Sequence, residues 1–227
     1  MKEYISALEA RCAAGDVLAM EELATYYYED RPAEMRGEVV SRVIGYYEEA
    51  AEAGRQRACL NLGAIYSDGM YASADRDRAE ALLTRARLGE NRRLAALACA
   101  RLGDLCVNED TARAFDYYLE GVLLCDHPIC LYKLGDTYRD GAFVRRDVEK
   151  AYFIYEKAKA VSAERFGNDG YGEILLRLAR AKLVGEGTAV DAAGARKYLT
   201  IAKRLPRKSS VAEDVPALAD ALLAKIG

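Results

Sequence analysis

Histidine is nearly absent from this sequence: His127 is the single one among 227 residues, and tryptophan is missing altogether. One imidazole removes most histidine-dependent catalytic arrangements from consideration. The sequence also lacks the G-x-S-x-G, H-E-x-x-H and P-loop motifs, which carry acyl-transfer, zinc and nucleotide chemistry. We therefore predict a protein that is not an enzyme and that has no catalytic residue, no cofactor and no metal ion.

Long apolar runs and an excess of one charge are missing too. No stretch approaches the roughly 20 apolar residues of a membrane-spanning helix. The net charge of −3 gives no basic surface for nucleic acid or anionic lipid. The N-terminal segment alternates charged and apolar residues and lacks a signal-peptide core. Since 52% of the residues are apolar, the chain can bury a core. We expect a folded cytoplasmic protein that contacts neither membranes nor nucleic acids.

The six cysteines do not follow a disulfide pattern. Cys99 and Cys106 lie on one predicted helix, about 10 Å apart along its axis, whereas a disulfide needs Cα atoms within about 7 Å. Cys125, His127 and Cys130 allow two interpretations: three zinc ligands, or a helix end, a turn and the start of the next helix. A structural zinc site normally has four ligands, and no partner pair such as C-x-x-C occurs. We favour the second interpretation.

What the sequence does contain is a cassette that recurs five times. Clear copies read LNLGAIYSDG around Gly63, ARLGDLCVNE around Gly103 and YKLGDTYRDG around Gly135, and weaker copies centre on Ala24 and Ala179. A second element follows each copy, with Ala or Val, then Tyr or Leu, then Ala or Gly at helical spacing. Self-similarity at about 30–45 residues is typical of an array of helix pairs. The small central residue lets paired backbones touch, which offsets the cost of about 1 kcal/mol for glycine inside a helix.

The predicted helix ends recur in the same phase. Six residues after the central residue stands a glycine suited to the left-handed position that ends a helix. Four residues before the second element stands an aspartate suited to an N-cap. The glycines are Gly69, Gly141 and Gly185, and the aspartates are Asp75, Asp110, Asp147 and Asp191. The first repeat lacks this cap, and the third has a shortened turn. A helix from about Lys2 to Ala13 opens the array, and a helix from Pro216 to Ile226 closes it.

In these residues the chain resembles the Sel-one-like repeats (SLR), relatives of tetratricopeptide repeats, over about residues 10–205. The resemblance implies an all-α fold, a right-handed α/α superhelix (solenoid) of five helix-turn-helix repeats, and a bacterial protein. We expect one SLR domain over residues 1–227. Its expected parts are an N-terminal helix (1–15), five repeats (16–54, 55–90, 91–125, 126–167 and 168–205) and a C-terminal cap (206–227). The family's second loop glycine is replaced by Tyr71 and Phe143 in two of the copies.

An array of this kind offers a surface for binding rather than an enclosed site for chemistry. Beside the buried stripe of each first helix runs a second stripe, which we expect on the concave side of the array. Its mixture of aromatic, arginine and acidic residues suits an extended peptide or a helix of a partner protein. The candidate binding residues are Glu21, Thr25, Tyr28, Arg57, Asp68, Asp104, Asn108, Tyr132, Asp136, Arg139 and Arg180. The sequence therefore predicts a protein-interaction adaptor or scaffold.

Three alternatives stay open. The first concerns the stripe alone, which is then a solvated face or a face covered by a neighbouring copy of the chain. The second is a structural subunit that self-assembles through its lateral or end faces. The third alternative comes from the resemblance, since the cysteine-rich secreted branch of the family is linked to penicillin binding and weak β-lactam hydrolysis. This chain lacks the regular cysteine pair of that branch, which argues against a β-lactam- or cell-wall-directed enzyme.

Overall fold

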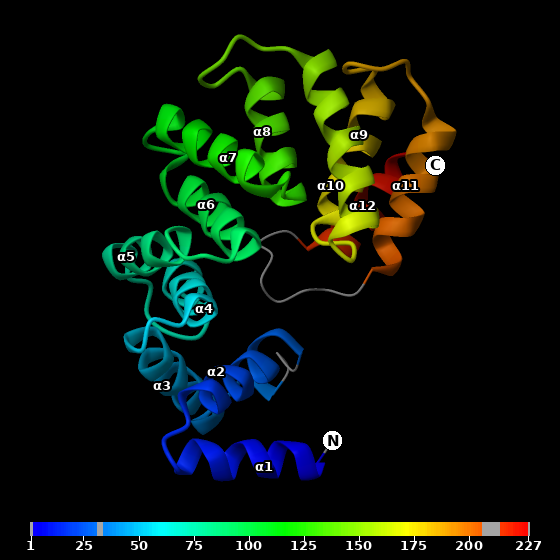
Figure 1. The fold of residues 1–227 in the computed structure, drawn as a ribbon. Helices are drawn as coiled ribbons and strands as arrows, with labels where there is room; N and C mark the ends of the chain where they lie inside the picture. Colours follow the sequence, from blue (N-terminus) through cyan, green and yellow to red (C-terminus); the bar gives the residue numbers. More distant parts are fainter. Residues whose placement is uncertain (1, 31–33, 206–213, 227) are drawn as a thin grey trace. The chain divides into compact units, whose positions relative to one another are not determined.

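The computed structural model describes residues 2–30, 34–205 and 214–226, and these residues form helices and turns without any strand. Figure 1 shows the helices in chain order. They are α1 (Lys2–Ala13), α2 (Val17–Thr25), α3 (Glu38–Glu52), α4 (Gln56–Asp68), α5 (Arg76–Arg87), α6 (Arg92–Cys106), α7 (Thr111–Cys125), α8 (Pro128–Asp140), α9 (Val148–Arg165), α10 (Tyr171–Val184), α11 (Ala192–Arg204) and α12 (Val215–Ile226). A π-helical turn, Tyr26–Asp30, continues α2. The all-α fold with five helix-turn-helix repeats is confirmed, and each predicted repeat range contains two helices.

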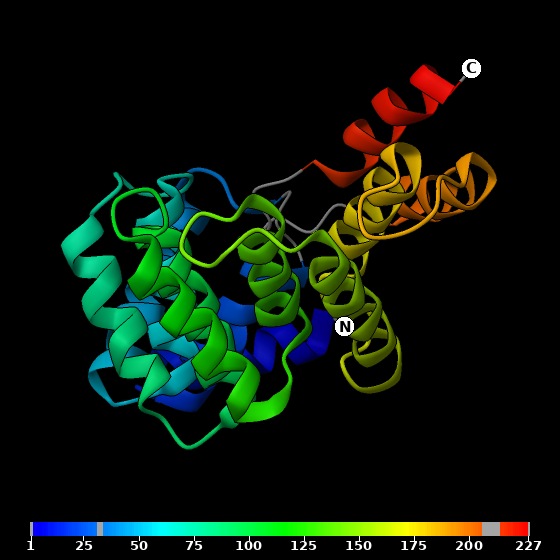
Figure 2. The ribbon, with the colours of Figure 1, turned by 90° about the horizontal axis from the view of Figure 1, so that it is seen from above.

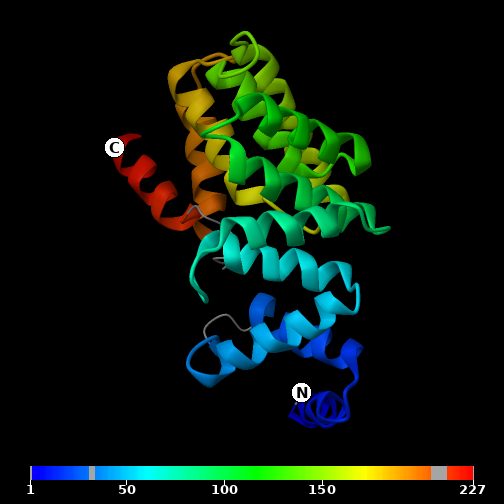
Figure 3. The ribbon, with the colours of Figure 1, turned by 90° about the vertical axis from the view of Figure 1, so that its left-hand side faces the viewer.

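The chain consists of two compact units, residues 1–105 and 106–227, so their boundary falls in the last turn of α6. In the first unit α1 packs on α2, α3 packs on α2 and α4, and α5 packs on α4, as the blue to cyan helices of Figure 3 show. In the second unit α8 packs on α7 and α9, and α10 packs on α9 and α11. The closing helix α12, red in Figure 2, lies against α11. Most contacts thus run between helices that follow one another, as in a repeat array.

Each unit has its own apolar core. In the first, Leu8 of α1 and Leu23 of α2 are fully buried in one cluster. In the second, Leu131 and Tyr155 are buried between α8 and α9, and Leu199 is buried where α11 meets α10 and α12. Burial of one apolar stripe per helix supplies the main stabilisation of such an array.

The central glycine of the cassette marks the closest approach of the paired helices. A Cβ atom on Gly135 of α8 would lie 2.5 Å from Cε1 of Tyr155 on α9. A Cβ atom on Gly63 of α4 would lie 2.8 Å from Cγ of Leu83 on α5. Both distances are shorter than a van der Waals contact, so no larger residue fits without a shift. The predicted reason for glycine inside these helices is confirmed at both positions.

The predicted helix ends are also confirmed. Gly69, Gly141 and Gly185 end α4, α8 and α10 with φ of +66°, +68° and +76°. Each N-cap aspartate accepts a hydrogen bond from the backbone N–H three residues on, at 2.8–3.0 Å. These caps are Asp75, Asp110, Asp147 and Asp191. Helix α3 instead begins after Gly37, which provides no side-chain cap, as the sequence predicted for the first repeat.

The cysteines and the histidine serve the fold. The six cysteines all lie in the described residues and form no disulfide, and five of them are buried. Cys125 ends α7, while His127 is the N-cap of α8, where its Nδ1 accepts a hydrogen bond from the Ile129 N–H at 3.4 Å. The His127 ring packs edge-on against Phe166 at 4.9 Å between centroids. The turn interpretation of the C-x-H-x2-C segment is therefore the one that the structure supports.

None of the helices in the described ranges combines the length and the hydrophobicity that a bilayer crossing requires.

Candidate functional site

The stripe predicted to face a partner proves to be only partly accessible. Glu21, Tyr28 and Tyr132 are buried; Thr25, Arg57, Asp104, Asp136, Arg139 and Arg180 are half-buried; Asp68 and Asn108 are exposed. The reason is that side chains on this flank reach the first helix of a neighbouring repeat, as Arg101 reaches Asp68 and Arg177 reaches Asp136. A side chain on that flank therefore contacts the neighbouring repeat and is shielded from solvent.

In the first unit the buried stripe residues hold neighbouring repeats together. The carboxylate of Glu21 on α2 pairs with Arg55 at 2.6 Å and accepts from the Ala58 N–H at 3.3 Å, both at the start of α4. The Tyr28 ring packs edge-on against Tyr47 and Tyr71, with centroids 6.1 Å away in each case. Burial raises the pKa of Tyr28 to about 12. Glu21 and Tyr28 therefore stabilise the packing of the first unit.

Polar links between the first helices recur at one register position. Two residues before the central residue of the cassette stand Asn61, Arg101 and Arg177, which sequence analysis did not single out. Asn61 Nδ2 donates to Glu29 of the preceding repeat at 2.9 Å, and Arg101 pairs with Asp68 of the preceding repeat at 3.5 Å. The shared register was the signal that could have revealed them, because residues at one position of a repeat face the same neighbour.

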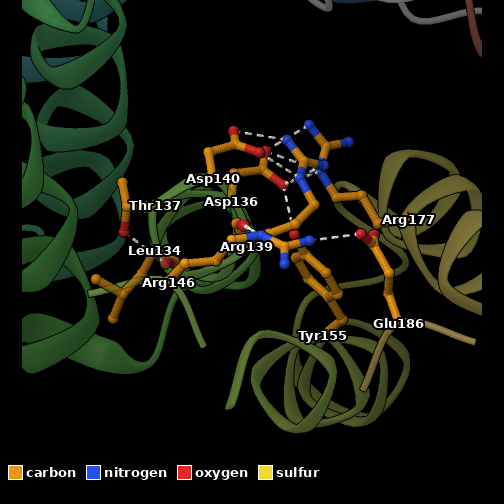
Figure 4. A network of polar contacts seen from close by, with 9 residues as sticks. All are labelled: Leu134, Asp136, Thr137, Arg139, Asp140, Arg146, Tyr155, Arg177 and Glu186. Atoms are coloured by element: carbon orange, nitrogen blue, oxygen red, sulfur yellow. Dashed lines mark hydrogen bonds and ion pairs between the residues drawn. The ribbon is translucent and has the colours of Figure 1, made fainter. Parts of the chain in front are cut away.

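The third of these links is the most extensive and lies wholly in the second unit (Figure 4). Arg177 of α10 donates to Asp136 of α8 from Nε, at 2.8 Å to Oδ1, and from Nη2, at 2.7 Å to Oδ2. The Tyr155 hydroxyl of α9 donates to Asp136 Oδ1 at 2.7 Å. Nη1 of Arg177 donates to the Glu173 carbonyl at 3.1 Å. The guanidinium carbon lies 4.4 Å from the centroid of the Tyr132 ring. Three helices are thereby tied at one carboxylate.

This network shifts the proton affinities of its members. Burial alone would raise the pKa of Asp136, but the charge and hydrogen bonds of Arg177, with Arg139 and Tyr155, outweigh it and hold the pKa below its ordinary value. Burial, and then the Asp136 charge, raise the pKa of Tyr155. The carboxylate is therefore ionised and the phenol protonated at neutral pH.

Next to this network lies a cavity of about 230 Å³ between α8, α9 and α10. Its lining is Arg139, Val148, Ala151, Tyr152, Tyr155, Arg177, Arg180, Ala181 and Glu186. Of the predicted binding residues, Arg139 and Arg180 reach its wall, and Asp136 holds the wall in place. Tyr132 does not line the cavity, but its ring lies against the guanidinium of Arg177, which does.

The charged groups around the cavity are paired, with one exception. Arg139 donates to Asp140 from Nε, at 2.7 Å to Oδ1, and lies 3.3 Å from Asp136. Glu186 pairs with Arg146 at 2.6 Å. Over the described residues, no hydrogen bond or ion pair engages Arg180, which is half-buried. The cavity thus carries one uncompensated positive charge beside tyrosine rings and aliphatic groups.

The acidic and phenolic side chains around the cavity have partners within the chain. No three side chains of the types His, Cys, Asp and Glu come together in a metal-binding arrangement among the described residues. The carboxylates at the cavity are engaged by arginines, and its tyrosine hydroxyls donate to carboxylates, Tyr155 to Asp136 and Tyr152 to Glu156.

Comparison with known proteins identifies the repeats. The sequence model of the Sel1 repeat family matches residues 44–54, 56–89, 92–122, 128–160 and 175–205, which together exceed half of the chain. The first match begins inside α3, so α2 and its π-helical turn lie outside the matched residues. No significant match is found among curated proteins.

Solved structures show the same fold at low sequence identity. A protective antigen of uropathogenic Escherichia coli that displays an SLR fold aligns with a TM-score of 0.69 and 17% identity. The alignment covers 98% of this chain and 44% of the antigen, so this chain spans less than half of that protein. A Sel1 repeat protein from Oxalobacter formigenes aligns with a TM-score of 0.62 and 20% identity, covering 99% of this chain and 95% of that one. A Sel1 repeat protein described for Klebsiella pneumoniae gives 0.57 and 17%, covering 98% of each chain.

Proposed function

Because the chain belongs to the Sel1 repeat family, whose members are generally protein-interaction scaffolds, we propose that it is a non-enzymatic scaffold that binds a peptide segment of a partner protein. The proposed binding surface is the first-helix side of the second unit, at the cavity between α8, α9 and α10. The stripe residues Asp136, Arg139 and Arg180 belong to it.

The observation that carries this proposal is the cavity itself. Its volume of about 230 Å³ is below the roughly 300–1,000 Å³ of pockets that hold whole small molecules. It has room for one side chain of a larger partner. Its wall combines the Tyr152 ring, aliphatic groups and the Arg180 guanidinium, the residue types that anchor protein interfaces.

The network under the cavity supports a binding role in a second way. Arg177, Asp136 and Tyr155 hold one another in a single arrangement before any partner arrives. A surface that is already ordered loses less conformational entropy on binding.

Two candidate residues of the stripe, Tyr132 and Arg139, are unsuitable positions for testing this surface. Replacing Tyr132 or Arg139 would disturb the fold, because Tyr132 is buried under Arg177 and Arg139 is bound to two aspartates. Tyr152, which lines the cavity, and Phe153, which is exposed, are neighbours on α9 and form a matched pair.

The test places a photo-cross-linking benzoylphenylalanine at position 152 or at position 153 of the full chain in its native cells. We expect an adduct with one protein from position 152, mapped to a short segment of that protein, and no such adduct from position 153. Circular dichroism confirms that both variants fold. Equal labelling from both positions, or none from 152, would contradict the proposal, and an adduct with a second copy of the chain would favour self-assembly instead.

A further inference from the structure

We infer that the cavity between α8, α9 and α10 recognises the carboxylate of an aspartate or glutamate side chain within the bound peptide, with Arg180 as its ligand. This inference rests on the proposed function and names the chemistry of the partner. It follows from the balance of charge around the cavity, from the wall beside Arg180 and from the rigidity of the helix that carries it.

The charge balance points to an anion with a single charge. Arg177 is compensated by Asp136, Arg139 by Asp140, and Glu186 by Arg146. Each of these pairs has an N–O distance of 2.6–2.7 Å. Arg180 remains as the cavity's one uncompensated charge among the described residues. A carboxylate carries one negative charge and two acceptor oxygens, which suits one guanidinium. A phosphate monoester carries up to two charges at neutral pH and would leave one of them without a counter-charge.

The remaining wall fits the rest of an acidic side chain. Val148, Ala151 and Ala181 present aliphatic groups to the cavity, and Tyr152 and Tyr155 present their rings. The methylene groups of an aspartate or glutamate would be covered by these apolar atoms while the carboxylate reaches the guanidinium. The hydroxyl of Tyr155 is committed to Asp136 at 2.7 Å, so its ring contributes contact area rather than a free donor.

Arg180 stands on an anchored helix. It follows Arg177 by three residues on α10, within one turn, and Arg177 is held by Asp136 and by the Glu173 carbonyl. An arginine whose backbone is held in place loses less conformational entropy when its guanidinium binds a ligand. Its half-buried position also removes part of the water that weakens exposed ion pairs.

The test uses a positional-scanning library of octapeptides, amidated at the C-terminus, whose binding to the purified full chain is read by fluorescence polarisation. One position is fixed in turn as Asp, Glu, Asn, Gln, Lys or phosphoserine. We expect the Asp and Glu sets to bind about tenfold more tightly than the Asn and Gln sets, the gain typical of a hydrogen bond to a charged group. The difference should shrink as the salt concentration rises.

Two variants locate the effect. Arg180→Gln should abolish the preference for acidic peptides, and Arg180→Glu should replace it with a preference for the Lys set. Arg145→Gln removes the same charge from the exposed α8–α9 loop at a residue that does not line the cavity, and it should keep the wild-type preference. Circular dichroism and the urea midpoint check that each variant is folded.

Each other outcome overturns the inference. An acid preference that survives Arg180→Gln would assign the charge to another site, and tighter binding of phosphoserine than of glutamate would refute the single-charge argument. Peptide binding without any acid preference would remove the inference and leave the scaffold proposal standing. Absence of binding by every set would reject carboxylate recognition, and the cross-linking from position 152 would then decide the scaffold proposal separately.

Discussion

Arg177 and Asp136 lie 41 residues apart in the sequence, yet Nη2 of the first is 2.7 Å from Oδ2 of the second. The pair joins α10 to α8 across successive repeats, and its side chains are 7% and 17% exposed. A buried ion pair of this kind is costly to break from one side, because the remaining charge keeps its desolvation penalty without its partner.

Asp136→Asn should therefore lower the free energy of unfolding by about 3 kcal/mol. The amide leaves the Arg177 charge buried without a counter-charge. Urea denaturation followed by circular dichroism measures the change. Asp140→Asn is the matched control, since the Asp140 side chain is 54% exposed and its pair with Arg139 should be worth about 0.5 kcal/mol or less. Equal losses of unfolding free energy in the two variants would show that the buried pair stabilises the fold no more than the exposed pair does.

Stability should also fall in acid through Asp136. Its pKa in the folded chain lies below the ordinary value of 3.8, because Arg177 and its hydrogen bonds outweigh the effect of burial. A carboxyl group with a lowered folded pKa contributes stability above its unfolded pKa, and the contribution is lost as the pH falls through the folded pKa. Urea midpoints measured from about pH 6 down to about pH 3 should fall more steeply for the wild type than for Asp136→Asn. Parallel profiles would contradict this assignment.

Two glycine-to-alanine substitutions should change the free energy of unfolding in opposite directions. Gly135→Ala places a Cβ atom 2.5 Å from the Tyr155 ring, and overpacking of this kind costs about 1–3 kcal/mol. Gly45→Ala, inside α3, has nothing within 4 Å of the new Cβ atom, so it should gain about 1 kcal/mol from helix propensity. Thermal unfolding of both variants is the measurement. A stabilising Gly135→Ala would mean that α8 and α9 are not in close contact.

The reactivity of the thiols tests the burial of the helices without any binding partner. Cys12, Cys59, Cys99, Cys106 and Cys130 are buried, and Cys125 is partly exposed. Burial raises the pKa of the Cys12 and Cys59 thiols, which further slows their reaction. Ellman's reagent should react with one thiol rapidly in the native chain and with six in urea. Cys125→Ser should remove the rapid reaction, and a second rapid thiol in the native chain would contradict the burial described above.

Much of the local structure was predictable because its causes lie within a few residues. The glycine at position 141 ends a helix because its left-handed conformation has no steric cost without a side chain. The carboxylate at position 147 caps the next helix by accepting the N–H of Lys150. The helix-ending glycine and the capping aspartate each act on neighbouring residues only, and both recur at the same positions of successive repeats.

The candidate site was predictable only in outline. The spacing of the cassette placed Tyr132 and Asp136 on one flank of the first helix, but it did not tell whether that flank meets solvent or another helix. Tyr132 proved to be buried under Arg177, whereas Arg180 remained at a cavity wall without a partner among the described residues. Periodicity gives the direction of a side chain from its helix, and burial depends on what packs there.

The sequence by itself thus determined the all-α fold, the phase of its five repeats and the residues that begin and end the helices, because capping, backbone conformation and hydrophobic periodicity act locally. The tertiary structure alone decided which charges neutralise one another and which guanidinium at the cavity has no partner among the described residues. Those outcomes depend on distances of a few ångströms between residues some 40 positions apart, such as Asp136 and Arg177, and such distances exist only once the helices have packed.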